Sequence, residues 1–278
     1  MSRRPDGVSG PPARHASLAG APVEGMAVAA IICAAGSSTR MGGIKKEYLP
    51  LPNNPSGLTV LGAVVRSFML LSEVRTIVIA VPRGDPATGE RAARNAIPPA
   101  ALNRKGGPSI HFVAGGKNRR ASVFNALSAL PKIFPAGEDA KNYVLIHDGA
   151  RPWISPRFVR RVIAELQKFP AVVPVLPLSE TPKETTLPLD NAFFRGKSAF
   201  PVYVKTHLKR SCLGMAQTPQ GFSYPEILAA HEMAAEHERI IGGEFTDDAE
   251  IWGAFHGSVA VIPGDAKNRK ITYPEDLV

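Results

Sequence analysis

The chain contains little cysteine, few aromatic residues and no long apolar run. Its 278 residues include two cysteines, Cys33 and Cys212, which are too few and too far apart for a disulfide framework or a cysteine zinc site. Aromatic residues make up 7% of the chain. No apolar stretch approaches the ~20 residues that a membrane-spanning helix needs. We therefore expect a protein with no membrane partner and two inert thiols in a reducing compartment.

Several common catalytic and phosphate-binding motifs are also absent. Five residues separate Gly36 from Gly42 and no lysine follows Gly42, so the Walker-type G-x-x-x-x-G-K-[ST] pattern is not met, and no G-x-G-x-x-G occurs. No G-x-S-x-G elbow and no Ser-His-Asp or Cys-His arrangement is evident. A covalent nucleophile is therefore not indicated.

The chain is basic, with a formal net charge of +9. Its cations are scattered, and no block of consecutive lysine and arginine with interleaved aromatic residues occurs. An anionic small molecule such as a nucleotide explains this charge as well as a polynucleotide does, so composition does not decide between them. A polynucleotide binder would have no use for a buried strand that ends at Asp148, and for that reason we expect no nucleic-acid partner.

Residues 1–25 differ in composition from the rest of the chain. They are rich in proline, glycine, alanine and serine without periodicity, which predicts a disordered tail before a single domain at 26–278. No 7–15-residue apolar core of a secretory signal is present, so a cytoplasmic location is expected. Arg3, Arg4 and Arg14 leave a plastid transit peptide as an alternative, which Asp6 and Glu24 weaken.

Apolar strand patterns alternate with amphipathic helix patterns from residue 28 onward. This order predicts an α/β fold: a Rossmann-like, mostly parallel sheet with helices on both faces. The expected strands are 28–35, 76–81, 111–113, 143–146, 171–175 and 258–262, and the expected helices are 58–72, 87–96, 122–130, 156–168, 225–237 and 247–254.

Residues 178–216 break this rhythm. They are polar, contain proline, and have strand-like patches at 192–194 and 202–205. We predict a protruding β-arm that packs on a second copy of the chain, with a flexible insertion as the alternative.

A loop of small residues and cations follows the first strand. Gly36, Gly42 and three hydroxyl residues accompany Arg40 and Lys46, a composition that suits a polyphosphate because backbone N–H groups approach the anion while cations offset its charge. An ordinary strand-to-helix turn on a basic protein is the alternative. Lys45 is expected to be a solvated neighbour.

Glycine and cations recur where other predicted strands end. Since parallel strands present their carboxyl ends at one edge, these residues should gather around one anionic ligand. Asp148, directly after a buried strand, suits a divalent metal that bridges phosphates, and a salt bridge with Arg151 is the alternative. His147 is expected to anchor the loop rather than bind metal. The recurrent segments are 36–46, Arg83, 115–120, 147–152 and 267–270.

With these residues laid out, the chain resembles the methylerythritol phosphate cytidylyltransferases of the non-mevalonate isoprenoid pathway. The resemblance runs collinearly from about 27 to 277. Ribitol-phosphate cytidylyltransferases share most of the motifs and are the nearest alternative, and a non-catalytic nucleotide sensor is another. The matching stretches are AAGSSTRMG (34–42), KEYL (46–49), GGxxRxxSV (115–123), HDGARP (147–152), TPK (181–183), QTPQGF (217–222), TDDA (246–249) and NxKITxPEDL (268–277).

The resemblance implies a reaction of CTP with methylerythritol 4-phosphate that yields the CDP-alcohol and pyrophosphate with Mg²⁺, in a homodimer joined by the 178–216 arm. It also implies roles for individual residues. The implied catalytic residues are Arg40, Lys46 and Lys270, and Asp148 is the implied metal ligand. The implied nucleotide-binding residues are Ala34, Ala35, Gly36, Ser37, Gly115, Arg119 and Ser122. The residues implied to bind or support the acceptor are Asp148, Arg151, Thr181, Arg210, Thr218 and Thr246.

Four features depart from the family pattern. Lys117 stands where an acidic residue is common, and 52–57 and 187–203 look longer than usual. The helix expected after Pro-Glu-Asp-Leu is missing from the sequence. These departures leave the register of the arm open.

Overall fold

A computed structural model describes residues 26–54, 57–84, 86–102, 106–134, 141–189, 191–197 and 199–277. The predicted tail, 1–25, lies outside these ranges, as do residues 55 and 56 of the long 52–57 turn. No helix within the described ranges is long and apolar enough to cross a membrane.

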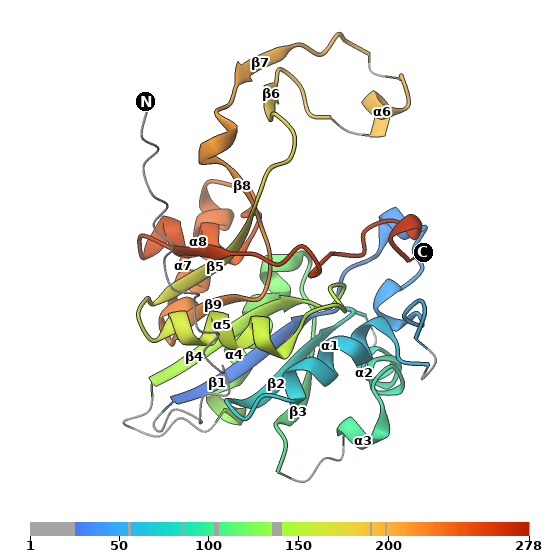
Figure 1. The fold of residues 1–278 in the computed structure, drawn as a ribbon, viewed down its shortest axis with the longest axis vertical. Coiled ribbons are helices and arrows are strands. Elements are labelled where there is room, and N and C mark those ends of the chain that lie inside the picture. Colours follow the sequence, from blue (N-terminus) through green and yellow to red (C-terminus); the bar gives the residue numbers. More distant parts are fainter. Residues whose placement is uncertain are drawn as a thin grey trace, which may run out of the picture.

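The centre of the molecule is a mixed, mostly parallel sheet in the order β10-β5-β9-β4-β1-β2-β3, which confirms the predicted α/β fold (Figure 1). β9 is an unpredicted strand that runs antiparallel between β4 and β5, and the short β8 pairs with β5 outside this order. The strands are β1 Met26–Cys33, β2 Val74–Val81, β3 Ser109–Ala114, β4 Lys141–Asp148, β5 Ala171–Pro177, β8 Gly214–Ala216, β9 Gln220–Tyr224 and β10 Ala260–Pro263.

Helices cover both faces of the sheet and enclose two hydrophobic cores. α1 Val60–Met69, α2 Pro86–Asn95, α3 Pro99–Leu102 and α5 Pro156–Leu166 pack on one face, and α4 Arg119–Ile133, α7 Glu226–Ile240 and α8 Asp248–Phe255 on the other. β1 explains the division: Val28, Ala30 and Ile32 point into the first core, while Ala29 and Ile31 point into the second. The continuous apolar run therefore reflects burial on both sides.

The strand order reverses between β1 and β4. From β1 the chain moves to β2 and β3 on one side, and then returns to place β4 on the other. Cys33 and Asp148, the last residues of β1 and β4, lie opposite each other in the ladder. Such a switch point leaves a crevice beyond the carboxyl ends of the strands.

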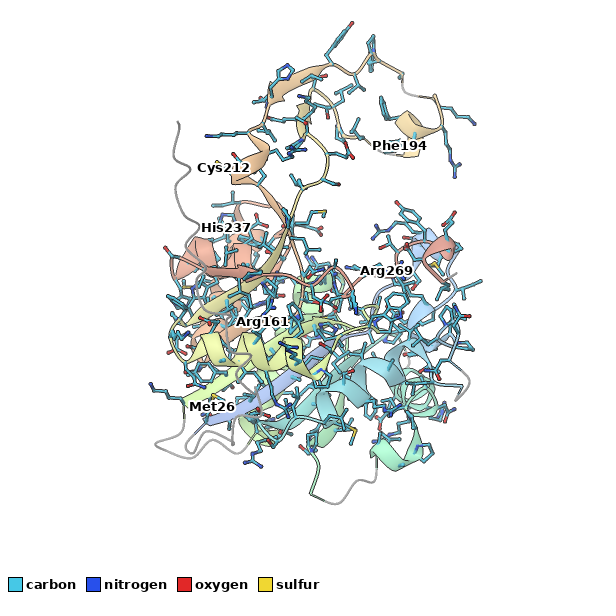
Figure 2. All side chains as sticks on the ribbon, in the orientation of Figure 1. Met26, Arg161, Phe194, Cys212, His237 and Arg269 are labelled. Carbon is cyan, nitrogen blue, oxygen red and sulfur yellow. The ribbon has the colours of Figure 1, made fainter. Side chains whose placement is uncertain are left out.

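The excursion predicted at 178–216 is an arm that extends from the sheet (Figure 1). Its outer part pairs β6 Lys183–Thr185 with β7 Val204–His207 in a separate two-stranded sheet, while β8 at its base joins the main sheet. The prediction of a strand at 192–194 is wrong, because these residues belong to the single helical turn α6 Asn191–Phe194. Phe194 and Cys212 both lie on this arm (Figure 2).

Candidate active site

A pocket of about 770 Å³ opens at the carboxyl ends of β1 and β4. The predicted gathering of the cation-bearing segments at one edge is confirmed. The lining contains Cys33, Ala35, Gly36, Ser37, Ser38, Thr39, Arg40, Lys45, Lys46, Glu47, Pro82, Arg83, Gly116, Lys117, Asn118, Arg119, Ser122, Asp148, Ala150, Lys270 and Thr272.

The loop after β1 is shaped by its own turns. Thr39–Met41 forms a 3₁₀ turn whose Met41 side chain is buried, and it ends at Gly42 with φ of 64°. A left-handed φ of this kind favours glycine, which explains Gly42. Arg40 extends over the ring of Tyr273, 5.8 Å from its centroid. The loop therefore reaches the C-terminal segment across the pocket.

The expectation that Lys45 is a solvated neighbour is wrong. Its Nζ donates to the carbonyl of Gly36 at 2.6 Å and lies 3.3 Å from a carboxylate oxygen of the buried Glu47. Burial lowers the pKa of Lys45, and Glu47 partly offsets this effect. The lysine therefore ties the two ends of the loop together.

Lys46 lines the pocket although it is only 8% exposed. Its burial lowers its pKa, Glu47 opposes the shift, and the positive charges of Lys270 and Arg40 add to the lowering. An ammonium group among other cations is poorly compensated, and a bound anion would relieve this repulsion.

The start of α4 forms the second wall. Asn118 caps the helix by accepting from the N–H of Ala121 at 2.9 Å, and Ser122 Oγ accepts from the N–H of Gly116 at 3.0 Å. A Cβ on Gly115 would collide with the Ala35 side chain and come within 3.0 Å of the carbonyl oxygen of Val81. Glycine is therefore needed for the close approach of the β1 loop to the residues that follow β3.

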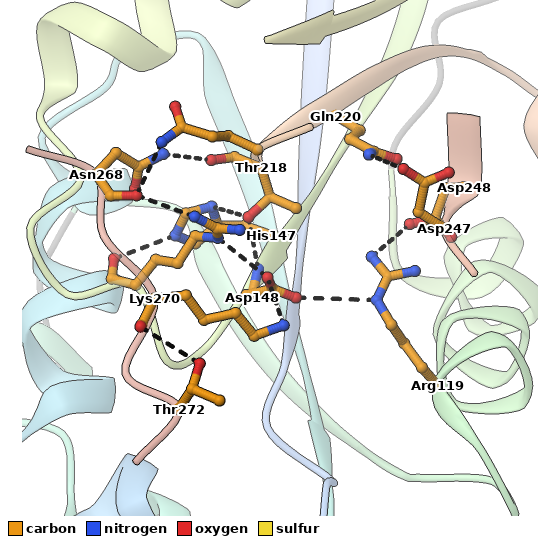
Figure 3. A network of polar contacts seen from close by, with 12 residues as sticks. Arg119, His147, Asp148, Thr218, Gln220, Asp247, Asp248, Asn268, Lys270 and Thr272 are labelled. Atoms are coloured by element: carbon orange, nitrogen blue, oxygen red, sulfur yellow. Dashed lines mark hydrogen bonds and ion pairs between the residues drawn. The ribbon is translucent and has the colours of Figure 1, made fainter. Parts of the chain in front are cut away.

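Asp148 lies at the base of the pocket among three cations. Its Oδ2 lies 3.0 Å from Lys270 Nζ and 3.1 Å from Arg151 Nε, while its Oδ1 lies 3.8 Å from Arg119 Nε (Figure 3). Burial alone would raise the pKa of Asp148, but Lys270, Arg119 and Arg151 hold it well below its usual range. Asp148 is therefore ionised, and it both lines the pocket and pairs with Arg151.

The donor set suits a magnesium ion that also binds phosphate. The described residues contain no group of three or more His, Cys, Asp or Glu side chains that could hold a metal. Mg²⁺ is commonly held by one or two carboxylates together with substrate phosphates and water. Asp148 Oδ1, whose cationic neighbour lies beyond hydrogen-bond distance, fits that requirement.

His147 anchors β4 from inside the protein, as predicted. Thr218 Oγ1 accepts from the N–H of Asp148 at 3.1 Å and lies 3.0 Å from His147 Nδ1. The hydroxyl can donate to Nδ1, which leaves the ring proton on Nε2, 3.4 Å from the carbonyl oxygen of Arg151. Burial lowers the pKa of His147 to about 4, so the ring is neutral at pH 7.

Two amide side chains hold the segment that carries Lys270, and neither was among the predicted site residues. Gln217 Nε2 donates to the carbonyl oxygens of Asp265 and Asn268, and its Oε1 accepts from the N–H of Asp265. Asn268 Nδ2 donates to the carbonyl of Thr218 at 2.7 Å (Figure 3). The match of the QTPQGF motif covered Gln217, but only the structure reveals what it contacts.

Several predicted site residues do not line the pocket of their own chain. Ala34 and Gly115 lie in the surrounding backbone, and Thr218 lies beneath Asp148. Arg151 donates to Asn268 O at 3.0 Å as well as pairing with Asp148. Thr246 Oγ1 donates to Glu250 at 2.7 Å and so secures the start of α8.

The two predicted arm residues are separate from this pocket. Arg210 Nη1 donates to the carbonyl of Ser179 at 2.6 Å, within the arm, and neither Arg210 nor Thr181 is among the pocket residues of the same chain. Sequence reasoning missed Cys33, Glu47 and Thr272 as lining residues. Burial raises the pKa of the Cys33 thiol to about 12, in agreement with the expected inert group.

Comparisons with known proteins identify the family of the chain. A family model for 2-C-methyl-D-erythritol 4-phosphate cytidylyltransferase matches residues 28–278. The enzyme of that name from Cereibacter sphaeroides is 36% identical over 254 residues, which cover 91% of this chain and 94% of the relative. The bifunctional enzyme IspD/IspF of Rhodobacter capsulatus is 37% identical over 253 residues, which cover 91% of this chain and 54% of that enzyme.

Solved structures give the same result. A 4-diphosphocytidyl-2C-methyl-D-erythritol synthase from Anaerococcus prevotii superimposes with a TM-score of 0.66 at 26% identity, covering 92% of this chain and 94% of the other. The 2-C-methyl-D-erythritol 4-phosphate cytidylyltransferase of Thermus thermophilus gives 0.57 at 29% identity, with coverages of 91% and 96%. The chain therefore belongs to the 2-C-methyl-D-erythritol 4-phosphate cytidylyltransferase family, whose members are nucleotidyltransferases.

Proposed function

We propose that this chain joins CTP and methylerythritol 4-phosphate to give the CDP-alcohol and pyrophosphate, a step in isoprenoid precursor synthesis. The observation that carries this proposal is the pocket at the β1–β4 switch point, which is lined by cations from four segments together with the ionised Asp148. An oxygen of the acceptor phosphate attacks the α-phosphorus of CTP as the bond to pyrophosphate breaks. Such a step needs alignment and charge neutralisation rather than a covalent nucleophile.

The loop after β1 is the proposed triphosphate site. Arg40 and Lys46 line the pocket from this loop, and the negative charge that develops on the α-phosphate and the leaving pyrophosphate would be stabilised by them. Lys45 acts indirectly, since its bond to the Gly36 carbonyl keeps the loop in shape. Lys270, which enters from the opposite wall, would align the attacking phosphate.

Base and ribose would lie between the first loop and the start of α4. Ala35, Gly36 and Ser37 line one side, with Ala34 in the backbone that precedes them, while Arg119 and Ser122 line the other, with Gly115 packed closely against Ala35. The bond from Gly116 N–H to Ser122 Oγ fixes the serine at this wall.

Mg²⁺ is the proposed metal, with Asp148 as its protein ligand. When bound, the ion would neutralise charge on the phosphates of CTP. Thr218 contributes by holding the backbone of Asp148, and Arg151 by pairing with its Oδ2. Thr246 supports the site from a greater distance, through the start of α8.

The arm is proposed to pack on a second copy of the chain. The arm carries exposed apolar side chains, among them Phe194 at 73% and Tyr203 at 66% in its outer part and Met215 at 48% at its base. Covering such a surface is favourable. Thr181 and Arg210, remote from the pocket of their own chain, would then bind the acceptor in the partner's site. Sedimentation analysis tests this idea, because Phe194→Asp with Tyr203→Asp should give monomers, and an unchanged dimer would contradict the arm contact.

The decisive assay is pyrophosphate release with CTP and Mg²⁺, comparing methylerythritol 4-phosphate with ribitol 5-phosphate as acceptor. We expect release with the first. Release with ribitol phosphate alone would reassign the acceptor, and release with neither, together with CTP binding, would favour a nucleotide sensor. The proposal places the reaction in the cytoplasm, where CTP is available.

A further inference from the structure

A buried ion pair lies behind the pocket, between the first residues of α4 and α8. Arg119 is the first residue of α4 and Asp248 the first of α8, and Arg119 Nη2 lies 2.7 Å from Asp248 Oδ2. His231, from α7, places its Nε2 3.2 Å from Asp248 Oδ1. Asp248 and His231 are both 0% exposed. One carboxylate thus joins three helices of the same face.

The other side of Arg119 faces the catalytic pocket. Its Nε lies 3.8 Å from Asp148 Oδ1, a longer separation than its contact with Asp248 (Figure 3). Lys270 and Arg151 both approach the other oxygen, Oδ2. Arg119 is therefore held between two carboxylates and sits closer to the one outside the pocket.

This placement matters because a guanidinium group forms strong hydrogen bonds with a carboxylate at shorter distances. If Arg119 moved onto Asp148, both oxygens of Asp148 would be occupied by cations. The ion pair with Asp248 opposes that movement, because it holds the Arg119 guanidinium away from Asp148. His231 Nε2 lies 3.2 Å from the second oxygen of Asp248, Oδ1, and this leaves Oδ2 directed at Arg119.

The free-energy cost of burying the Asp248 carboxylate must be offset by favourable interactions. A carboxylate removed from water is costly unless it is paired, and the start of a helix favours negative charge. Burial alone would raise the pKa of Asp248, whereas Arg119 and His231 lower it. The group is thus ionised behind the pocket, where it exerts its full charge on Arg119.

We propose that Asp248, supported by His231, is a positioning residue that holds Arg119 beside Asp148 rather than on it, and so keeps the pocket open to a nucleoside triphosphate and its divalent metal. This inference rests on the proposed function, since it concerns how that site is prepared for its nucleotide. The competing explanation is that the ion pair only ties α4, α7 and α8 together.

The test is Asp248→Asn in the full chain, with Asp247→Ala as the matched control. Asparagine preserves the shape of Asp248 and removes its charge. Asp247 is the adjacent helix cap: it accepts from the N–H of Glu250 and from Gln220 Nε2, each at 2.8 Å, whereas Arg119 pairs with Asp248. Its loss should destabilise α8 without freeing Arg119. The measurements are thermal unfolding, the affinity for CTP with Mg²⁺ by calorimetry, and KM for each substrate.

We expect Asp248→Asn to weaken CTP binding and raise KM for CTP by about tenfold or more, with KM for the acceptor unchanged. Asp247→Ala should lower the unfolding temperature and leave KM for CTP unchanged. Equal CTP affinity in wild type and Asp248→Asn would overturn the inference, as would equal effects on KM for CTP in both variants.

His231 provides a second test that does not alter the carboxylate. His231→Leu should shift KM for CTP in the same direction as Asp248→Asn, and His231→Gln, which retains a donor near the Nε2 position, should restore it. Identical values in both His231 variants would remove His231 from the proposal. A wild type that binds CTP without releasing pyrophosphate would contradict the proposed function, while the calorimetric comparison would still decide the inference.

Discussion

The hydroxyl of Thr218 accepts a hydrogen bond from the backbone N–H of Asp148 at 3.1 Å, although 70 positions separate the two residues in the chain. This bond connects the start of β9 to the last residue of β4. It fixes the carboxylate at the base of the pocket through its backbone, leaving the side chain to meet Lys270, Arg151 and Arg119.

Replacing Thr218 by valine should therefore affect both stability and activity. The variant preserves shape but leaves the buried Asp148 N–H and His147 Nδ1 without their partner, at a cost of about 1–3 kcal/mol in the free energy of unfolding. Urea unfolding and pyrophosphate release measure the two effects. Thr218→Ser is the control, because it retains the hydroxyl and should behave like the wild type. Equal stability in valine and serine variants would contradict the role of the bond.

His147 should make the folded state sensitive to acid. Its folded pKa of about 4 lies below the ordinary 6.5, so between these values the unfolded chain binds a proton that the folded chain does not. Stability from this group is present above pH 6.5 and is lost as the pH falls towards 4, by up to about 3 kcal/mol. Urea unfolding at several pH values measures this loss.

The control is His147→Asn, which keeps an acceptor near the position of Nδ1 and does not titrate in this range. Other acidic groups act in wild type and variant alike, so the difference between the two curves isolates His147. If the free energies of unfolding of the wild type and the variant fall in parallel between pH 6.5 and 4, the His147 ring is not held neutral in the folded protein.

Lys270→Ala should abolish turnover while the protein remains folded. Its side chain is 37% exposed and contributes charge rather than core packing, and loss of one stabilising group of this kind typically reduces kcat by roughly a hundredfold or more. Lys267→Ala is the matched control: the residue is exposed on the same segment and does not line the pocket. Near-normal turnover in a folded Lys270→Ala variant would remove Lys270 from the mechanism.

Lys46→Ala should also abolish turnover, and Lys46 should set an alkaline limit on the wild-type enzyme. Because burial lowers the pKa of Lys46 below 10.5, its ammonium loses the proton, and with it the charge that offsets the phosphates, at a lower pH than an exposed lysine. The profile of kcat/KM for CTP, which reports groups of the free enzyme, should fall with an apparent pKa below 10.5.

Lys46→Arg provides the comparison for this limit, since a guanidinium stays charged through that range. If the arginine variant retains activity, its alkaline limb should move to higher pH. A limb at the same pH in both proteins would assign the titration to another group.

The sequence alone determined the α/β class, the positions along the chain of the parallel strands, and the loops that meet at the edge of the pocket. A strand buried on both faces, such as β1, has a continuous apolar sequence, which makes it recognisable. Cations that follow several such strands converge at one edge, because parallel strands end at the same edge of the sheet. The start of α5 is equally local, because Ser155 caps the helix by accepting from the N–H of Phe158.

Only the tertiary structure decided which contacts these residues make, and hence which role each one has. The antiparallel strand β9 depends on a long-range pairing with β4 and β5 that no local pattern expresses. In the sequence, Lys45 cannot be distinguished from other loop lysines, because its hydrogen bond to the Gly36 carbonyl depends on the fold of the loop. His231 lies outside every recognised motif, and its place beside Asp248 and Arg119 exists only because α4, α7 and α8 pack on one face of the sheet. Local sequence encodes backbone propensity and burial, whereas the distances between charges, and hence their chemistry, arise when distant segments are brought together.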